Sequence, residues 1–313
     1  MKLQQFRYLK EIAKRNLNLS EAAEALHTSQ PGVSKQIRQL ELELGVDLLV
    51  RHGKRVVDMT EPGREILGIV DRILQDAENL KQVAREHGAQ GSGSLVIATT
   101  HTQARYALPP VVSRFMQQYP RVQLSLRQGS PEHIAELVRS GEADLAITTE
   151  AAEHYDGLVL MPCHQWTRCV ITPLKHALLK EKPLTLEAVA RYPLVTYDFA
   201  LASNSPVKRA FDQRRLAPKV VLTAIDADVI KVYVETGLGI GILAKMAFDP
   251  ARDTGLRLID ASHLFEPSMA RIGLRPNAYL RGYAYAFIEM FAPHLNRAVV
   301  DATLMGKGSS YEL

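Results

Sequence analysis

The chain has 313 residues, which is too long for one ordinary hydrophobic core and indicates two or three compact units joined by linkers. Its content of 46% hydrophobic and 23% charged residues is typical of a globular protein and argues against disorder. The net charge of +4 permits nucleic-acid binding without requiring it.

The N-terminus carries no apolar signal core, and no run is long and apolar enough to span a bilayer. We therefore expect a cytoplasmic protein that has no membrane partner. The two cysteines, Cys163 and Cys169, match no zinc-binding spacing. We expect both to be packing residues that stay as thiols, and we expect no metal site.

Three short helices are predicted before residue 45. Apolar residues recur at helical spacing from Leu3 to Ile12, which predicts an amphipathic first helix. Asn18 can cap a second helix. A third begins after Ser29, a typical N-cap residue, and carries Pro31 in its first turn, where a missing N–H is tolerated.

The third helix has an apolar stripe from Val33 to Leu44, and its opposite face carries hydrogen-bonding groups and cations but no acid: Gln30, Ser34, Lys35 and Arg38. Two short helices with a tight turn are typical of a helix-turn-helix, whose second helix enters the major groove of DNA. An ordinary helical hairpin with a solvated polar face is the alternative. The stretch Val46 to Val57 alternates around a basic tip, Arg51 to Arg55, and predicts a hairpin wing that touches phosphates.

A long helix is predicted from Glu61 onward, because apolar residues alternate in steps of four and three between Ile66 and Ala84. This seam packs either on its own domain or on a second copy of the helix. We favour a homodimer, since helix-turn-helix proteins commonly bind paired half-sites. Three glycines between residues 87 and 93 then predict a hinge.

From Ser94 the pattern changes to strands alternating with amphipathic helices, which predicts a mostly parallel α/β sheet. A second α/β unit follows, so we expect a cleft between two lobes. Ligands of such sheets bind beyond the carboxyl ends of the strands. Those ends carry polar side chains: Thr99, Thr100, Thr102, Gln103, Gly129, Ser130, Thr148, Thr149 and Glu150.

The hydroxyl-rich group lies where a helix is expected to begin, and the free N–H groups there favour a bound anion. The alternative for any single threonine is that it only caps a helix. Later segments, from Arg271 to Phe291, are expected to return to the first lobe, so that two crossovers form a hinge.

We expect no enzyme and no cofactor. The run Gly237 to Gly241 follows a helix and precedes an apolar strand-like stretch, the reverse of the order that a dinucleotide fold needs. No GxSxG, P-loop or HExxH motif is present, and nothing brings His101, Glu150 and Cys163 together as a catalytic set.

The stretch TSQPGVSKQIRQLELELGVDLLVRHGKRVVDMTEPG resembles the DNA-binding domain of LysR-type transcriptional regulators. The segments ATTHTQARYALP, QGSPEHIAEL, ADLAITTEA, PLVTYDF and AIDADVIKVYVETGLGIGILA are similar to the narrower sulfur-assimilation group that contains CysB and Cbl. The resemblance extends from Met1 to about Asn296. THTQARYALP is its most specific block.

The resemblance implies an α/β protein in which a winged helix-turn-helix and linker helix precede a two-lobed, periplasmic-binding-protein-like effector domain. The implied domains are residues 1–60 for DNA binding, 61–90 for the linker, dimerisation helix and hinge, and 91–313 for the effector. Within the effector domain, lobe I takes about 91–162 and 268–313, and lobe II about 163–267.

The resemblance further implies a homotetramer that binds double-stranded promoter DNA, contacts RNA polymerase and regulates genes of cysteine biosynthesis or of sulfonate-sulfur use. Its implied effector is sulfate, adenosine phosphosulfate or an acetylserine. The implied effector-binding residues are Thr100, Thr102, Gln103, Thr149, Glu150, Trp166 and, in place of the group's threonine, Ser203. The implied DNA-binding residues are Ser29, Gln30, Pro31, Ser34, Lys35, Arg38, Arg51, Lys54 and Arg55.

Two other functions remain open. The chain could be a LysR-type regulator of another pathway that senses a different small anion. It could also be a solute-binding protein without a regulatory role, although the helix-turn-helix and the missing signal peptide argue against this.

Overall fold

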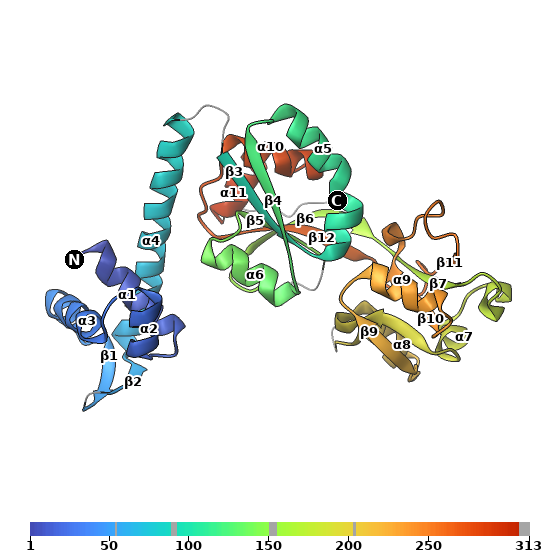
Figure 1. Cartoon of the computed structure of the whole chain (residues 1–313), viewed down its shortest axis with the longest axis horizontal. Helices are drawn as coiled ribbons and strands as arrows, with labels where there is room; N and C mark the ends of the chain where they lie inside the picture. The colour runs from blue at the N-terminus through green and yellow to red at the C-terminus, as the bar shows by residue number, and fades with distance from the viewer. Residues whose placement is uncertain (54, 89–92, 150–154, 203–204, 307–313) are drawn as a thin grey trace. The chain divides into compact units, whose positions relative to one another are not determined.

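The computed structural model describes residues 1–53, 55–88, 93–149, 155–202 and 205–306. The chain divides into two compact units, Met1–His87 and Gly88–Leu313, each with its own hydrophobic core (Figure 1). No helix among the described residues is long and apolar enough to cross a membrane.

The first unit is a winged helix-turn-helix followed by a long helix (Figure 1). Its elements are α1 Leu3–Lys14, α2 Leu19–Ala25, α3 Gln30–Leu44, β1 Leu49–His52, β2 Arg55–Met59 and α4 Glu61–Gly88. Both predicted caps are present. Asn18 Oδ1 accepts hydrogen bonds from the N–H groups of Ser20 and Glu21, and Ser29 Oγ accepts one from Gly32. Gly45 ends α3 in the left-handed region, at φ 73°, where a side chain would be strained.

The core of the first unit gathers the apolar faces of its helices around fully buried Leu9, Ile12, Ile37 and Leu40. A buried carboxylate ties α3 to the wing. Glu41 Oε1 accepts hydrogen bonds from the backbone N–H groups of Leu48 and Leu49, at 3.0 and 3.2 Å. Because these N–H groups lie outside any helix, the carboxylate satisfies donors that burial would otherwise leave unpaired.

Only part of the apolar seam of α4 packs on its own domain. Val70 is buried in the core of the first unit, and Ile66 packs against the same core. Ile69, beside the seam, and the seam residues Ile73 and Leu80 are 46, 36 and 71% exposed. The seam therefore packs on its own domain only in part, and its exposed residues are open to a partner. The side chains of residues 81–88 lie outside the described part.

The second unit contains two five-stranded mixed sheets (Figure 1). The first has the order β4-β3-β5-β12-β6, in which β12 is antiparallel to its neighbours β5 and β6. Its elements are β3 Gly93–Thr99, the π-helix η1 Gln103–Ala107, α5 Leu108–Gln118, β4 Val122–Gln128, α6 Pro131–Ser140, β5 Leu145–Thr148, β6 Val159–Trp166, β12 Ser268–Leu274, α10 Gly282–Phe291 and α11 Arg297–Leu304. We call this assembly the first lobe.

Alternation along β3 explains how this sheet is covered. Leu95 and Ile97 belong to the core that contains Phe115 of α5 and Phe287 of α10, whose rings meet edge to face at 5.3 Å. Ala98 points to the other face and packs with Ile134 of α6. Helices α5 and α10 accordingly lie on one side of the sheet and α6 on the other (Figure 1).

The second lobe has the sheet order β11-β7-β10-β8-β9. Its elements are β7 Arg168–Pro173, the 3-10 helix η3 Ala177–Lys180, α7 Leu186–Ala190, β8 Leu194–Tyr197, the 3-10 helix η4 Asp198–Leu201, α8 Pro206–Gln213, β9 Val220–Ala224, α9 Ala227–Glu235, β10 Ile240–Ala244, the 3-10 helix η5 Lys245–Ala247 and β11 Leu256–Asp260. The run Gly237 to Gly241 follows helix α9 and leads into strand β10. A dinucleotide fold needs the opposite order, with a strand before the glycines and a helix after them.

Two chain segments cross between the lobes, one from β6 to β7 and the other from β11 to β12. Buried Arg168 links them, because its guanidinium donates hydrogen bonds to the Ser268 hydroxyl, at 2.9 Å, and to the Glu266 carbonyl, at 3.3 Å. The cysteines Cys163 and Cys169 are buried free thiols on either side of this crossing, and burial raises the pKa of each to about 12. Both contribute to the hydrophobic core.

Candidate functional site

The polar face of α3 presents the side chains that the sequence assigns to base and phosphate contacts. Lys35 and Arg38 are exposed, and Gln30 and Ser34 are half-buried at the same surface. Val33, Ile37 and Leu40 hold the opposite face in the core. The helix thus offers amide, hydroxyl and cationic donors from a rigid support, as readout of base edges requires.

A notch of about 580 Å³ lies between the start of α2, the start of α3 and the wing. Gln30 and Arg55 both line it, so the fold brings together two residues that are 25 positions apart in the chain. His52, which belongs to the predicted basic tip, also lines the notch, as does Ser20, which was not predicted. The position of Ser20 in the first turn of α2, next to the Asn18 cap, was a signal that could have identified it.

One predicted phosphate contact, Arg51, is paired with a carboxylate within the protein. Arg51 is directed at Glu41, with guanidinium nitrogens 3.1 and 2.8 Å from the two carboxylate oxygens. Only 21% of its side chain is exposed. This ion pair links β1 of the wing to α3. Lys54 lies outside the described residues.

The second unit holds a cleft of about 490 Å³ between its two lobes. It is lined from the first lobe by Thr100, His101 and residues 128–132, and from the second lobe by Asp198, Phe199, Ala202, Ile225 and Asp226. Thr100 follows β3 directly, and the helical segment that starts at His101 directs its first N–H groups toward this end of the sheet. The cleft therefore lies where the sequence predicts a ligand, beyond the carboxyl ends of the strands.

Four buried polar atoms, two of them on the cleft-lining residues Thr100 and His101, have no hydrogen-bond partner among the described residues. They are Thr100 Oγ1, His101 Nδ1, Gln103 Oε1 and Trp166 Nε1. Thr100 is 9% exposed, Gln103 is 0% exposed and Trp166 is 8% exposed. Unpaired buried polar groups are rare and unfavourable. Three of the predicted site residues therefore carry hydrogen-bonding capacity that the described part of the chain leaves unused.

Other predicted residues reach the second lobe instead of lining the cleft itself. The Thr102 hydroxyl lies 3.4 Å from the Tyr197 hydroxyl, and Gln103 Nε2 lies 3.9 Å from the Met246 sulfur. Thr149 follows β5 and is buried. Glu150 and Ser203 lie outside the described residues. Tyr197 was missed, although its position at the end of a predicted strand was the signal that could have identified it.

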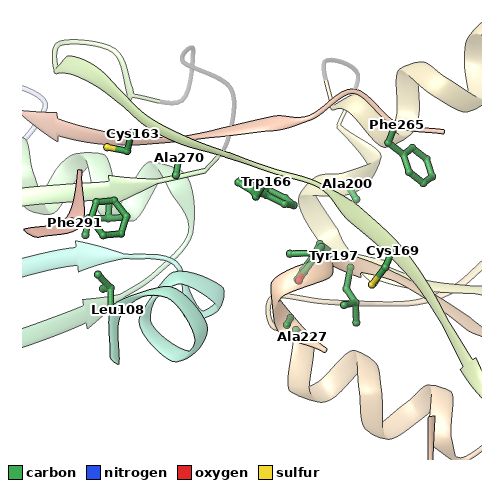
Figure 2. Packing of buried hydrophobic residues seen from close by; sticks show 14 of the residues in the cluster. Leu108, Cys163, Trp166, Cys169, Tyr197, Ala200, Ala227, Phe265, Ala270 and Phe291 are labelled. Carbon is green, nitrogen blue, oxygen red and sulfur yellow. The ribbon is translucent and has the colours of Figure 1, made fainter. Parts of the chain in front are cut away.

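Trp166 lies on β6 where this strand leaves the first lobe. Figure 2 shows its ring between the labelled residues of the first lobe, such as Leu108 and Phe291, and those of the second, such as Tyr197 and Ala227. The Arg168 guanidinium lies 4.6 Å from the centre of the Trp166 ring. This cation–π contact and the hydrogen bonds of Arg168 fix the ring at the crossing between lobes.

Among the described residues, the lining of the cleft includes no Lys or Arg but does include the carboxylates of Glu132, Asp198 and Asp226. An anion there would be held by neutral donors, away from these three acids. Within the described residues, no group of three or more His, Cys, Asp or Glu side chains could hold a metal ion. The arrangement can bind and sense a small polar molecule.

Two family models together match most of the chain. Residues 3–64 match the bacterial regulatory helix-turn-helix proteins of the LysR family, and residues 88–296 match the LysR substrate-binding domain. The chain belongs to the LysR family. It is a DNA-binding transcriptional regulator with a small-molecule-binding domain, and not an enzyme.

The relatives are closely similar over their whole lengths. The chain is 53% identical to the transcriptional regulator CysB of Burkholderia cenocepacia, with all of both chains covered. It is 54% identical to the regulator SsuR of the same organism, over 97% of this chain and 99% of the relative. The solved cofactor-binding domain of the Cbl transcriptional regulator matches with a TM-score of 0.66 and 38% identity, over 69% of this chain and 95% of that domain.

Proposed function

We propose that this regulator controls genes of sulfur assimilation, either for cysteine biosynthesis or for the use of sulfonate sulfur, and that it acts on promoter DNA in the cytoplasm. The observation that carries this proposal is the set of buried, unpartnered polar atoms on Thr100, Gln103 and Trp166, in a chain more than half identical to CysB and SsuR. These atoms give the domain a place to sense a small polar signal.

The proposed effector is sulfate, adenosine phosphosulfate or an acetylserine. Thr100, Thr102, Gln103, Thr149 and Trp166 bind it, together with Glu150 and Ser203. A tetrahedral anion needs several hydrogen-bond donors. Hydroxyl, amide and indole groups, together with N–H groups at a helix start, supply them without a counter-charge. The buried positions of Thr100 and Gln103 support this assignment, since burial strengthens hydrogen bonds to an anion.

On DNA, we assign Gln30, Pro31, Ser34, Lys35 and Arg38 to base edges and nearby phosphates, with the Ser29 cap at the start of the helix. Arg55 and Lys54 contact the phosphate backbone from the wing. Arg51, the remaining predicted phosphate contact, reaches DNA only as far as its pairing with Glu41 allows. Its main contribution is to position the wing.

The proposed assembly is a homodimer through α4 and a homotetramer overall, which contacts RNA polymerase at the promoter. The exposed residues Ile69, Ile73 and Leu80 support pairing of α4 with a second copy, because an isolated helix would leave these side chains in water. Effector binding would bias the relative arrangement of the lobes and thereby the spacing of the paired DNA-binding domains.

Calorimetry on the full-length chain tests the effector assignment. Sulfate, adenosine phosphosulfate and O-acetylserine are titrated separately, and the titrations are repeated with Thr102→Ala. Since Trp166 is the chain's single tryptophan, its fluorescence reports the same binding event independently. We expect one of the three to bind and Thr102→Ala to weaken it. Binding of none would contradict the sulfur assignment and favour a LysR-type regulator of another pathway, whose effector is a different anion.

DNA footprinting tests the regulatory half of the proposal. We expect the effector to change the footprint or the bend of promoter DNA more than it changes overall affinity. Superimposable footprints with and without each candidate effector, while transcription still responds, would contradict transmission through domain spacing.

A further inference from the structure

A second group of polar contacts joins the two lobes of the effector domain beside the cleft. We call Arg105, Tyr106, Asp228, Lys231 and Asp253 the interlobe clamp. From η1 of the first lobe, the Tyr106 hydroxyl donates a hydrogen bond to Asp228 of α9, at 2.6 Å. In turn the Lys231 ammonium donates to the Tyr106 oxygen, at 2.9 Å. Arg105 pairs with the other oxygen of Asp228, at 2.5 Å.

The clamp is partly desolvated, so its contacts are stronger than surface ion pairs. The Lys231 side chain is 10% exposed and that of Asp253, 3.1 Å away, is 11% exposed. Burial alone would lower the pKa of Lys231, but its hydrogen bonds with Tyr106 and Asp253 outweigh burial and raise it. The ammonium stays charged, and it holds the Tyr106 hydroxyl in the orientation that donates to Asp228.

The same short π-helix carries clamp and effector residues. Gln103 is the first residue of η1 and Tyr106 the fourth, and the Leu108 N–H donates to the Gln103 carbonyl across the wide π turn. Pro109 and Pro110, which follow in α5, have no N–H to give to the carbonyls of η1. Such π turns are uncommon and occur frequently at functional sites. Because Gln103 and Tyr106 belong to the same π turn, we expect a shift of Tyr106 to move Gln103 as well.

We propose that the interlobe clamp holds the two lobes in the arrangement seen here and thereby sets the affinity of the effector cleft. In this arrangement Thr102 lies against Tyr197, and Gln103 lies against Met246. Tyr106, Asp228 and Lys231 are positioning residues that act on the effector through η1. The affinity half of this proposal rests on the proposed effector site.

The test uses the full-length chain with sulfate as the probe. Tyr106→Phe removes the hydroxyl that joins Asp228 to Lys231 but keeps the ring. We expect it to raise the Kd for sulfate at least about five-fold, the lower end of usual coupling between sites. Asp228→Asn also removes the charge that Arg105 and Lys231 pair with, so its effect should be at least as large. The losses in the double variant should be less than additive, because the two residues share the Tyr106–Asp228 hydrogen bond.

A matched control exists within the first lobe. The Tyr285 hydroxyl donates to Asp301 of α11, so Tyr285→Phe breaks a tyrosine–aspartate hydrogen bond that does not cross between lobes. We expect its sulfate Kd to stay within about two-fold of the wild type, which is inside ordinary additivity error. An equal loss of affinity in both tyrosine variants, or an unchanged Kd in Tyr106→Phe, would overturn the proposal.

Hydrogen exchange separates failure of the clamp from failure of the effector assignment. Without any ligand, amides of η1 and α9 should exchange faster in Tyr106→Phe than in the wild type or in Tyr285→Phe. Equal exchange would overturn the clamp even if sulfate binds. A wild-type chain that binds no sulfate would overturn the affinity half together with the sulfate assignment, and faster exchange would then still support the cross-lobe contact.

Discussion

The polar face of α3 and the cleft between the lobes differ in how their polar groups are satisfied. Lys35 and Arg38 extend into solvent from a helix whose other side is fully buried. Thr100 and Gln103 are themselves buried, and their side-chain oxygens have no partner in the part of the chain that the structure describes. The groups of the first surface can be hydrated, whereas those of the second keep hydrogen-bonding capacity that a bound polar molecule could use.

At both surfaces, the residues that bind should be separable from the residues that stabilise the fold. Substitutions on the exposed face of α3 should alter DNA binding and leave folding unchanged, since exposed groups lose little when removed. Substitution of an unpartnered buried hydroxyl should weaken effector binding without destabilising the free protein. The residues that support each surface, by contrast, are satisfied within the protein, and their loss should destabilise it.

Glu41→Ala should produce the largest effect. The change leaves the Leu48 and Leu49 N–H groups and the Arg51 guanidinium without their buried acceptor. We expect a loss of about 3 kcal/mol or more in the free energy of unfolding of the first unit, as for other broken buried pairs. Calorimetric melting of the full-length chain measures it, with exposed Glu43→Ala on the same helix as the control. Equal melting of the two variants would show that the carboxylate does not support the wing.

Gln30→Ala should change DNA discrimination by about 1–3 kcal/mol per base pair contacted, the usual range for a bidentate amide. Its melting temperature should match that of the wild type, since the side chain is not part of the core. Selection of binding sites from random DNA, followed by competition among the selected sequences, measures the effect. Uniform weakening across all sequences would instead assign Gln30 to the phosphate backbone.

Thr100→Val should weaken sulfate binding about ten-fold, which corresponds to about 1.4 kcal/mol. It should leave the unliganded protein as stable as the wild type or more stable by up to about 1 kcal/mol, because the lost hydroxyl has no partner among the described residues. Calorimetric titration and urea unfolding measure the two quantities. This pairing of effects is the sharpest test of the cleft's incomplete polar groups.

Thr172→Val is the matched control for Thr100→Val. Thr172 is fully buried, and its hydroxyl donates to the Pro173 carbonyl at 3.1 Å, within the second lobe. We expect this variant to lose about 1 kcal/mol of stability and to bind sulfate normally. Destabilisation of both variants to the same degree would contradict the distinction between partnered and unpartnered hydroxyls.

Arg55→Ala should have the smallest effect. An exposed arginine on the wing adds one phosphate contact, so its removal should weaken binding to all sequences and lower the slope of log K against log salt by about 0.9. Binding to one fragment at several salt concentrations measures the slope. An unchanged slope would contradict the wing assignment and leave phosphate contact to α3 alone.

The helix-turn-helix could be predicted because its signals are local. The Asn18 and Ser29 caps, the apolar stripe of α3 and the alternating wing each depend on neighbours within a few residues. The pairing of Glu41 with Arg51 could not be predicted from those signals. An arginine in a wing is equally suited to DNA and to a buried acid, and only packing brings this acid within 2.8 Å.

Part of the proposed effector site also rests on local signals. A strand followed by Thr100 and a helix start is a local pattern, and the resemblance to sulfur regulators added Trp166. Tyr197 and the clamp residues Asp228 and Lys231 reach this site from the second lobe. These second-lobe residues lie far from Thr102 and Tyr106 in the sequence. The chain brings them together only by crossing between the lobes, so no local sequence pattern relates them.

The sequence by itself determined the order of elements, the α/β class of the second half, and the family. These follow from side-chain periodicity and backbone preference, which act over a few residues and leave a readable pattern. Only the tertiary structure decided which buried polar groups find partners, how the seam of α4 divides between core and surface, and which residues of the two lobes meet. Such contacts depend on long-range packing, where many distant residues compete for the same space and the same hydrogen bonds.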